Sequence, residues 1–175
     1  PGIDPPGTPG HYFEGCMVWR YHPDIREFEI FAEGGGNVFG LEFDTSGRLF
    51  SGHNGGGTRG FHYVQNGFYL KQGKSPGKFG PPDNPFSFGE LPMMPGGNIP
   101  RFSHNVIAIN GSAMPDDWQD KLLGADPLHR HLVLSERSVR GASFTTRDLA
   151  FPVNNSDVAF RPVYMVNAPD GSVLI

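Results

Sequence analysis

Cysteine, long apolar runs and clustered basic residues are all scarce in this sequence, and each scarcity excludes a class of protein. Cys16 is the single cysteine, so the chain has no internal disulfide, no CxxC zinc motif and no CxxCH haem motif. We expect Cys16 to pack as a small apolar side chain. No apolar stretch approaches the roughly 20 residues of a membrane span. The net charge is −4 and the sequence has no basic stripe or run, which argues against nucleic acid as a partner.

Helical patterns are nearly absent as well. The one helix-like segment is 115–120, where an aspartate after Pro115 is placed to cap a single turn. A parallel-sheet α/β fold needs a helix between successive strands, so that class is excluded. The chain begins without an initiator methionine and stops inside an apolar run, and we expect it to be a piece of a longer protein.

Glycine and proline, in contrast, are abundant. The 175 residues include 25 Gly and 17 Pro, about twice the usual share. Fifteen Phe argue against disorder, because disordered chains are poor in aromatic residues. Many turns between short strands explain both features, since Gly supplies positive φ and Pro presets φ near −65°. The composition therefore predicts an all-β fold.

Local patterns predict short strands along the whole chain. Residues 28, 30 and 32 (Phe, Ile, Ala) should share one face of a strand, and residues 27, 29 and 31 (Glu, Glu, Phe) the other. Asn66-Gly67 between two apolar runs predicts a type I′ hairpin, which needs positive φ at both central residues. The predicted strands are 11–20, 25–32, 39–43, 48–51, 61–65, 68–72, 105–110, 121–125, 129–135, 139–145, 160–166 and 173–175, with turns or loops at 21–24, 33–37, 44–47, 151–157 and 168–171.

Repeats indicate how these strands are organised. An apolar strand, a turn closed by Gly and a second apolar strand recur from residues 39, 104 and 161. The segment 73–101 is rich in Pro and Gly and predicts a long loop. Without this loop the repeat is roughly 40 residues, typical of a propeller blade. We predict one region, 1–175, forming a partial β-propeller of about two and a half four-stranded antiparallel blades; a β-sandwich is the alternative.

Two segments resemble a known family. Residues 23–50, PDIREFEIFAEGGGNVFGLEFDTSGRLF, resemble the blade junction of glucose/sorbosone dehydrogenase-like propellers. The closing FRPVYMVNAPDGSVLI is similar to the FRP and PDG elements of that family, and in particular to a bacterial branch of membrane-bound dehydrogenases. The resemblance implies a fragment of a sugar or alcohol dehydrogenase located in the periplasm or elsewhere outside the cytoplasm. Its implied partners are a small sugar or alcohol substrate, the remaining blades and a cytochrome c domain.

The resemblance also implies a quinone cofactor, pyrroloquinoline quinone, together with Ca²⁺. In such enzymes a His accepts the hydroxyl proton of the substrate, which an imidazole can do near neutral pH. His104, next to the predicted strand 105–110, is the predicted base, and Arg161 is predicted to hold charge on the reduced quinone. The alternatives are a loop hydrogen bond for His104 and an ion pair with Asp157 or Asp148 for Arg161.

Three further residues are predicted to contact the cofactor: His53, His129 and Arg130. His53 follows a predicted strand beside a Gly run. His129 and His131 have the i, i+2 spacing that puts both imidazoles on one face of a strand. No third ligand accompanies this pair, so the metal ligands stay unassigned.

Other residues leave the function open. Glu42, Asp44 and Asp170 are carboxylates that suit Ca²⁺, although Asp in such turns more often forms turn hydrogen bonds. No paired Arg-x-Arg of the quinone-binding type is present. Two alternatives to the dehydrogenase are a non-catalytic propeller module that binds carbohydrate or a protein partner, and a Ca-dependent lactonase-type hydrolase.

Overall fold

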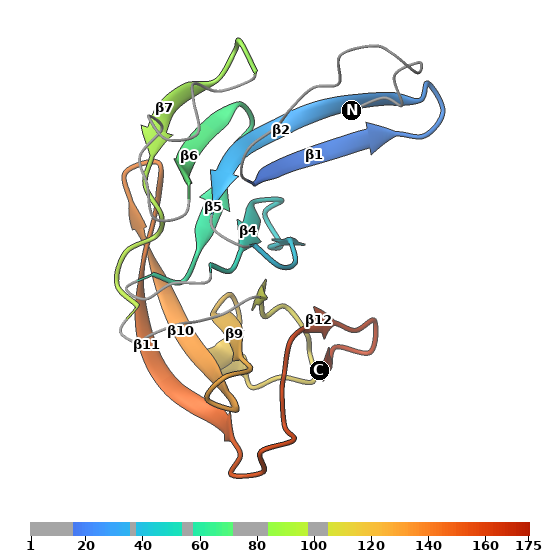
Figure 1. Ribbon diagram of the computed structural model, residues 1–175. Helices are drawn as coiled ribbons and strands as arrows, with labels where there is room; N and C mark the ends of the chain where they lie inside the picture. Colours follow the sequence, from blue (N-terminus) through green and yellow to red (C-terminus); the bar gives the residue numbers. More distant parts are fainter. Residues whose placement is uncertain (1–15, 36–37, 54–57, 72–83, 98–104) are drawn as a thin grey trace. The chain divides into compact units, whose positions relative to one another are not determined.

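The computed structural model describes residues 16–35, 38–53, 58–71, 84–97 and 105–175. They form an all-β structure of short strands and turns, as predicted (Figure 1). These ranges contain no α-helix, and a 3₁₀ turn, η2 (Asp116–Trp118), occupies the predicted helical segment without a side-chain cap. None of the described segments is a helix long and apolar enough to cross a membrane. The chain divides into unit 1, Pro1–Gly36 with Val64–Leu91, and unit 2, Asn37–Tyr63 with Pro92–Ile175.

Unit 2 contains a four-stranded antiparallel meander in the order β11-β10-β9-β8. Its strands are β8 (Val106–Ala108), β9 (Leu122–Asp126), β10 (His131–Arg140) and β11 (Ser143–Asn154). β10 and β11 form a long hairpin (Figure 1) that turns at Gly141, where φ is +60°. The prediction of one strand over 139–145 is therefore wrong. The predicted loop 151–157 is also wrong as far as Asn154, because β10 supplies backbone partners for this part of β11.

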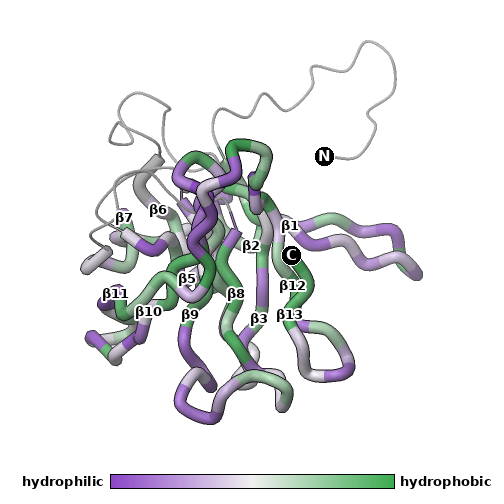
Figure 2. The backbone as a smooth tube through the Cα atoms, turned by 90° about the horizontal axis from the view of Figure 1, so that it is seen from below, coloured by the Kyte–Doolittle hydropathy of each residue, from purple (hydrophilic) through white to green (hydrophobic). Residues whose placement is uncertain are grey.

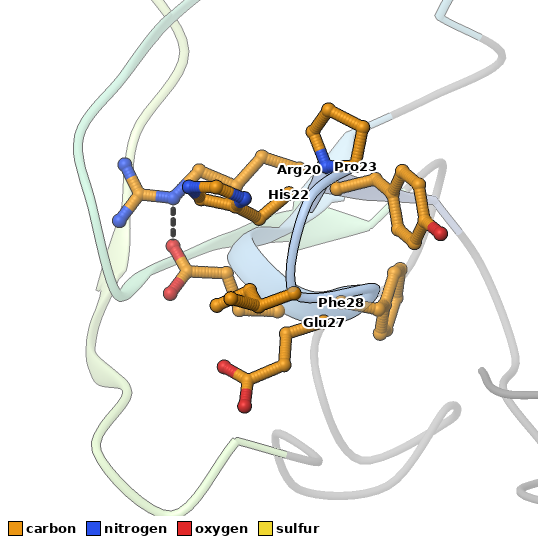
Figure 3. Close-up of a pocket in the computed structure, with 8 residues that line it drawn as sticks. Arg20, His22, Pro23, Glu27 and Phe28 are labelled. Atoms are coloured by element: carbon orange, nitrogen blue, oxygen red, sulfur yellow. Dashed lines mark ion pairs between the residues drawn. The ribbon is translucent and has the colours of Figure 1, made fainter.

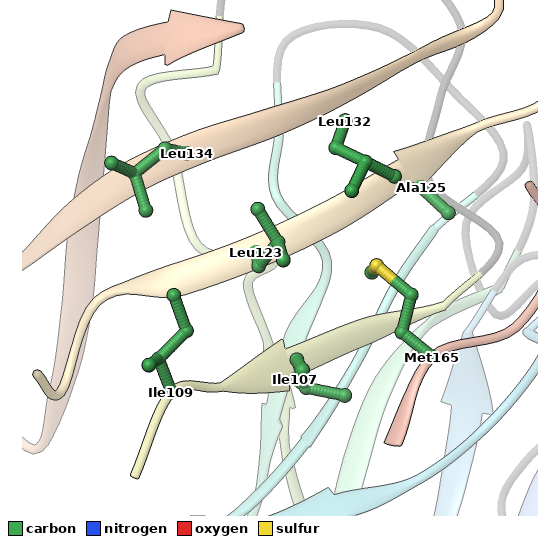
Figure 4. Packing of buried hydrophobic residues seen from close by; sticks show 7 residues of the cluster. All are labelled: Ile107, Ile109, Leu123, Ala125, Leu132, Leu134 and Met165. Carbon is green, nitrogen blue, oxygen red and sulfur yellow. The ribbon is translucent and has the colours of Figure 1, made fainter. Parts of the chain in front are cut away.

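Both faces of β8 and β9 are buried, which explains their nearly continuous apolar sequences (Figure 2). In the register, Leu123 faces Ile107 on one side and Leu134 on the other. These three residues belong to a cluster shown in Figure 4, whose members are Ile107, Ile109, Leu123, Ala125, Leu132, Leu134 and Met165. The opposite faces contribute to a second cluster, formed by Phe50, Met94, Val106, Ala108, Leu122 and Phe144.

Two smaller antiparallel sheets complete unit 2. One is three-stranded, with β3 (Glu42–Phe43), β4 (Leu49–Ser51) and β5 (Phe61–Tyr63). The other pairs β12 (Val166–Asn167) with β13 (Val173–Leu174). The predicted Gly-closed turns are confirmed in both: Gly47 N–H donates to the Asp44 carbonyl, and Gly171 N–H to that of Ala168. Both glycines have positive φ.

Unit 1 is a mixed sheet in the order β1-β2-β6-β7. Its strands are β1 (Met17–His22), β2 (Glu27–Gly35), β6 (Gly67–Lys71) and β7 (Phe88–Leu91). β1 and β2 are antiparallel, but β2 with β6 and β6 with β7 are parallel. Antiparallel pairing throughout is therefore a wrong prediction for this unit. The predicted loop 73–101 also contains β7, and the predicted turn 21–24 lies instead at 23–26.

The predicted hairpin over 61–72 does not form. β5 pairs with β4 in unit 2, whereas β6 pairs with β2 and β7 in unit 1. Asn66 has a φ of +61°, but Gly67 is not in the left-handed region, so the type I′ turn is absent. Asn66 N–H instead donates to the Phe31 carbonyl at 2.6 Å, and the Asn66 side chain accepts from Asn84. These contacts lead the chain into β6, which pairs with β2.

The glycines of the predicted loop 33–37 are part of strand β2 as far as Gly35. Gly34 has a φ of +101°, and a Cβ at this position would lie 2.1 Å from the Tyr69 carbonyl oxygen. Only glycine permits this approach of β6. Buried Glu33 adds a second link, because its Oε1 accepts from the backbone N–H of Asn84 at 2.7 Å.

Candidate functional site

A polar cluster lies at the connection between β9 and β10 in unit 2. Asp126 ends β9, His131 begins β10, and His129 lies in the turn between them. Asp126 Oδ2 is 2.7 Å from Nδ1 of His129 and 3.3 Å from Nε2 of His131. The two imidazoles stack with their centroids 5.8 Å apart. One carboxylate oxygen thus faces both rings.

Local sequence explains the turn. Asp126 Oδ1 accepts hydrogen bonds from the backbone N–H groups of Leu128 and His129, both at 3.0 Å, which is a typical aspartate turn. Arg130 follows with a φ of +63°. His129 and His131 therefore meet because the chain reverses before β10, and not because they alternate along one strand as predicted. The turn leaves the His129 side chain 47% exposed over an Asp126 side chain that is 1% exposed.

The two histidines differ in their surroundings. Burial is the main cause that lowers the pKa of His131; Asp126 opposes this shift, and nearby His129 and Arg59 reinforce it. Burial therefore disfavours the protonated form of His131. Its ring also packs on Phe151, with centroids 4.5 Å apart. His131 therefore supports the cluster from the interior, while His129 faces solvent.

A second polar group links Arg59, which precedes β5, to β10 and β11. The Arg59 guanidinium, 1% exposed, binds both carboxylate oxygens of Asp148, at 2.6 and 2.8 Å. Ser135 Oγ donates to Asp148 Oδ1 at 2.7 Å. Gly97 makes room for this arrangement, because a Cβ there would lie 2.8 Å from the guanidinium carbon. The bidentate pairing gives Arg59 a single orientation.

The His129–Asp126 pair has the arrangement of a general base with an orienting carboxylate. Asp126 accepts the Nδ1 proton of His129, which leaves Nε2 as the ring nitrogen that can take up a proton. The buried carboxylate also stabilises the imidazolium that such a transfer creates. Burial also disfavours a second positive charge on the neighbouring His131 ring. The pair is thus suited to removing a proton from a bound hydroxyl.

The other predicted site residues lie apart from this pair or outside the described residues. His104 lies outside the described residues. His53 is buried with its ring edge against Phe61, centroids 5.4 Å apart. Arg161 is exposed, and its Nη1 donates to the Phe160 carbonyl at 3.2 Å. Arg130 adjoins His129, but its Nε donates to the Asn155 carbonyl at 3.3 Å.

The carboxylates considered for Ca²⁺ serve the protein interior and its turns. Asp44 accepts from Arg48 at 2.6 Å and lies 2.8 Å from Arg137. Burial alone would raise the pKa of Asp44, but hydrogen bonds from Arg48 and Arg137 lower it overall. Asp170 accepts from Ser172. Burial raises the pKa of Glu42. Across the described ranges, no three metal-ligating side chains are arranged to hold an ion.

These contacts also test the implied cofactor. His53 is buried against Phe61, Arg130 is bonded to a backbone carbonyl, and the Asp44 carboxylate is held by two arginines. The described residues alone therefore do not form a cradle for pyrroloquinoline quinone or a Ca²⁺ site. The ion pairs suggested for Arg161 do not form either: Asp148 binds Arg59, and Asp157 accepts from the Ala159 backbone.

Sequence reasoning missed Asp126 and the Arg59–Asp148 pair. Asp126-Pro127 between two predicted strands is a turn signal that could have identified Asp126. Nothing in the sequence links Arg59 to Asp148, because 89 positions separate them and only tertiary packing joins them.

Fold and site together define an all-β protein in which the half-exposed His129 pairs with the buried Asp126. Residues 13–175 match the model of a family described as a domain of unknown function, DUF7133, and the chain belongs to this family. Neither a curated protein nor a solved structure matches the chain. The family description names no activity, so the functional argument depends on the residues themselves.

Proposed function

We propose that this chain is part of a β-propeller oxidoreductase acting on a sugar or alcohol hydroxyl, with His129 as the base that accepts the hydroxyl proton. The observation that carries the proposal is the half-exposed His129 imidazole held at 2.7 Å by the buried Asp126 carboxylate. The resemblance of 23–50 and 160–175 to glucose/sorbosone dehydrogenase-like propellers supports the reaction class.

The meander β8–β11 supports the propeller part of the proposal. Its four strands pair consecutively and antiparallel, as in a blade. Burial falls from β8, in which every residue is buried, to β11, most of which is partly or fully exposed. This gradient is the one expected between the inner and the outer strand of a blade.

The chemistry needs two groups to leave the substrate. Oxidation of an alcohol to a carbonyl removes the O–H proton and a hydride from the same carbon. His129 Nε2 takes the proton, and Asp126 stabilises the resulting imidazolium. The hydride would pass to the quinone cofactor that the resemblance implies, and no described residue of this chain is assigned to hold that cofactor. His104, the base predicted from the sequence, stays a prediction because it lies outside the described residues.

The same proposal assigns partners and location. The remaining blades complete the propeller, and a cytochrome c domain receives the electrons. These partners place the protein in the periplasm or elsewhere outside the cytoplasm. They follow from the resemblance alone.

The test is turnover in the full-length parent protein, supplied with pyrroloquinoline quinone and Ca²⁺ and assayed with a reducible dye on a panel of sugars and alcohols. His129→Gln keeps the size and polarity but removes the base, so turnover should fall by roughly 10²- to 10⁴-fold. Arg147→Gln, an exposed change on β11, should retain the wild-type rate. Unchanged turnover in the His129 variant, or no dye reduction by wild type with any substrate, would contradict the proposal.

A non-catalytic carbohydrate-binding module is the second candidate. The observation that favours it is the exposure of two aromatic side chains on β1 of unit 1, Trp19 and Tyr21, which have no part in the His129 chemistry. For the lactonase-type hydrolase no such observation exists among the described residues.

A further inference from the structure

Two Asn-Gly sequences lie within the described residues, Asn66-Gly67 in unit 1 and Asn110-Gly111 in unit 2. A third, Asn54-Gly55, lies outside them. In an Asn-Gly sequence the backbone nitrogen of the glycine can attack the side-chain carbonyl carbon of the asparagine, because glycine has no Cβ to obstruct the approach. Asparagine therefore counts among the thermolabile residues. The sequence alone gives the two described sites the same reactivity.

In the folded chain the Asn66-Gly67 site is held at both reacting groups. The Gly67 N–H, which carries the attacking nitrogen, donates to the Val64 carbonyl at 3.0 Å. Asn66 Oδ1 accepts from Nδ2 of Asn84 at 3.0 Å, and the Asn66 N–H donates to the Phe31 carbonyl. The side chain and the nitrogen must both leave these partners before they can react with each other.

The Asn110-Gly111 site is arranged differently. Asn110 is exposed and follows closely after β8. Within the described ranges, no hydrogen bond engages the Asn110 side chain or the Gly111 N–H. The backbone on either side is anchored: the Ile109 N–H donates to the Lys121 carbonyl at 2.9 Å. The Gly111 carbonyl accepts from the Met114 N–H at 3.0 Å. The reacting groups thus have no described partner to give up, although their neighbours are fixed.

Packing requires the glycine at position 111. A Cβ there would lie 1.9 Å from the Gly171 carbonyl oxygen, so no other residue fits. The fold therefore imposes the residue type that hinders the attack least. Exposure without glycine is not sufficient. Asp24 is exposed at the tip of the β1–β2 hairpin beside Pro23 (Figure 3), but it precedes Ile25, whose β-branched side chain crowds the attacking nitrogen.

We propose that Asn110-Gly111 is a deamidation site of the folded protein. The Gly111 nitrogen bonds to Cγ of Asn110, the Cγ–Nδ2 bond breaks, and the N–H proton ends on the departing ammonia. The product is a cyclic succinimide. Water then opens either carbonyl–nitrogen bond of the ring, adding its hydroxyl to carbon and its proton to nitrogen, which gives aspartate or isoaspartate. Water is the only co-reactant, and nothing is oxidised or reduced.

The reaction changes unit 2 at a point where the chain is tightly held. Both products place a negative charge at position 110. Isoaspartate also adds a methylene to the backbone between Ile109, a member of the buried cluster, and Gly111, which is packed on Gly171. Close-packed neighbours do not absorb such an insertion without strain. We therefore expect the isoaspartate form to unfold at a lower urea concentration. No residue of the His129 cluster takes part, so the site is independent of the proposed dehydrogenase step.

The experiment is incubation of the full chain at pH 8, followed by peptide mapping that separates asparagine, aspartate and isoaspartate at each site. Asn110 should convert at least about 10-fold faster than Asn66, because two hydrogen bonds of ordinary strength must open at Asn66. In guanidinium chloride the two sites should convert at comparable rates, since the difference comes from the fold. Asn110→Gln, a change of an exposed side chain, should abolish conversion at 110 and keep the urea midpoint that aged wild type loses.

Three results would overturn the proposal. The first is conversion of Asn66 in the folded chain at the rate of Asn110 or faster. The second is an Asn110 that stays intact in the folded chain while it converts in guanidinium chloride. The third is a urea midpoint that falls equally on ageing of wild type and of Asn110→Gln, which would place the damage elsewhere. Turnover is not measured, so failure of the dehydrogenase proposal would leave these results intact.

Discussion

The β1–β2 hairpin of unit 1 and the β8–β11 meander of unit 2 differ in how far their apolar strand residues are buried. In the meander, β8 and β9 are apolar on both faces and every residue of both strands is buried. In the hairpin, Trp19 and Tyr21 are more than half exposed. The comparison shows that an aromatic strand sequence does not by itself indicate a core strand. Whether a second layer covers the strand decides its role.

The two regions also differ in how far their ion pairs are exposed to solvent. Arg59–Asp148 in unit 2 joins a nearly fully buried guanidinium to a carboxylate that also accepts from Ser135. Arg20–Glu29 in unit 1 lies between two side chains that are each about half exposed. Water screens an exposed ion pair and solvates either charge when its partner is removed. A buried charge that loses its partner stays unsolvated.

The largest expected difference comes from removing one partner of each pair. Arg59→Ala should lower the free energy of unfolding by about 3 to 5 kcal/mol, because Asp148 keeps its charge without its partner. Arg20→Ala should change it by less than about 1 kcal/mol. Urea denaturation of both variants measures the contrast. Equal effects would show that the two pairs are equally solvated and would remove this part of the comparison.

A second comparison uses one residue type, isoleucine, in both regions. Ile107→Ala creates a cavity in the β8–β9 core and should lower the free energy of unfolding by about 2 to 5 kcal/mol. Ile30→Ala on half-buried β2 should lower it by about 1 kcal/mol, because less apolar surface returns to water. Thermal and urea unfolding report both. A larger loss at Ile30 than at Ile107 would reverse our assignment of the better-packed region.

The smallest expected effect is a pH dependence confined to unit 2. The pKa of His131 lies below its ordinary value of 6.5, so the unfolded chain binds this proton more readily than the folded chain. The contribution to stability is fully present above pH 6.5 and is lost as the pH falls through the folded pKa. Urea unfolding between pH 7.5 and 5 should therefore show a decline that His131→Gln reduces. Phe43→Ala, which removes no titratable group, should keep the wild-type decline; a steeper decline in the His131 variant would contradict the assignment.

Some local structure was predictable because its causes are local. The turns at 44–47 and 168–171 formed as predicted, since each depends on an Asp hydrogen bond and a Gly with positive φ a few residues away. The alternation of Phe28 and Ile30 with Glu27 and Glu29 also appears in the burial of β2. The alternation ends at Phe31, the extra residue of β2 at the bulge opposite Val18 and Trp19.

The conformation at Asn66-Gly67, where the predicted hairpin does not form, was not predictable from these two residues. Its sequence suits a type I′ turn, but the Phe31 carbonyl and the Asn84 side chain, both distant in sequence, hold Asn66 in another conformation. The candidate site divides in the same way. The aspartate turn that presents His129 depends only on the local sequence Asp126-Pro-Leu-His. The burial of His131 and its proximity to Arg59 arise only in the folded unit.

The sequence by itself determined the all-β class, through its Gly and Pro content, its missing helical periodicity and its alternating strands. These features act through backbone sterics over a few residues and need no distant partner. Tertiary structure alone decided the parallel pairing of β6 with β2 and β7, the bidentate Arg59–Asp148 contact and the exposure of Trp19. Each of these depends on which segments, far apart along the chain, exclude water from one another.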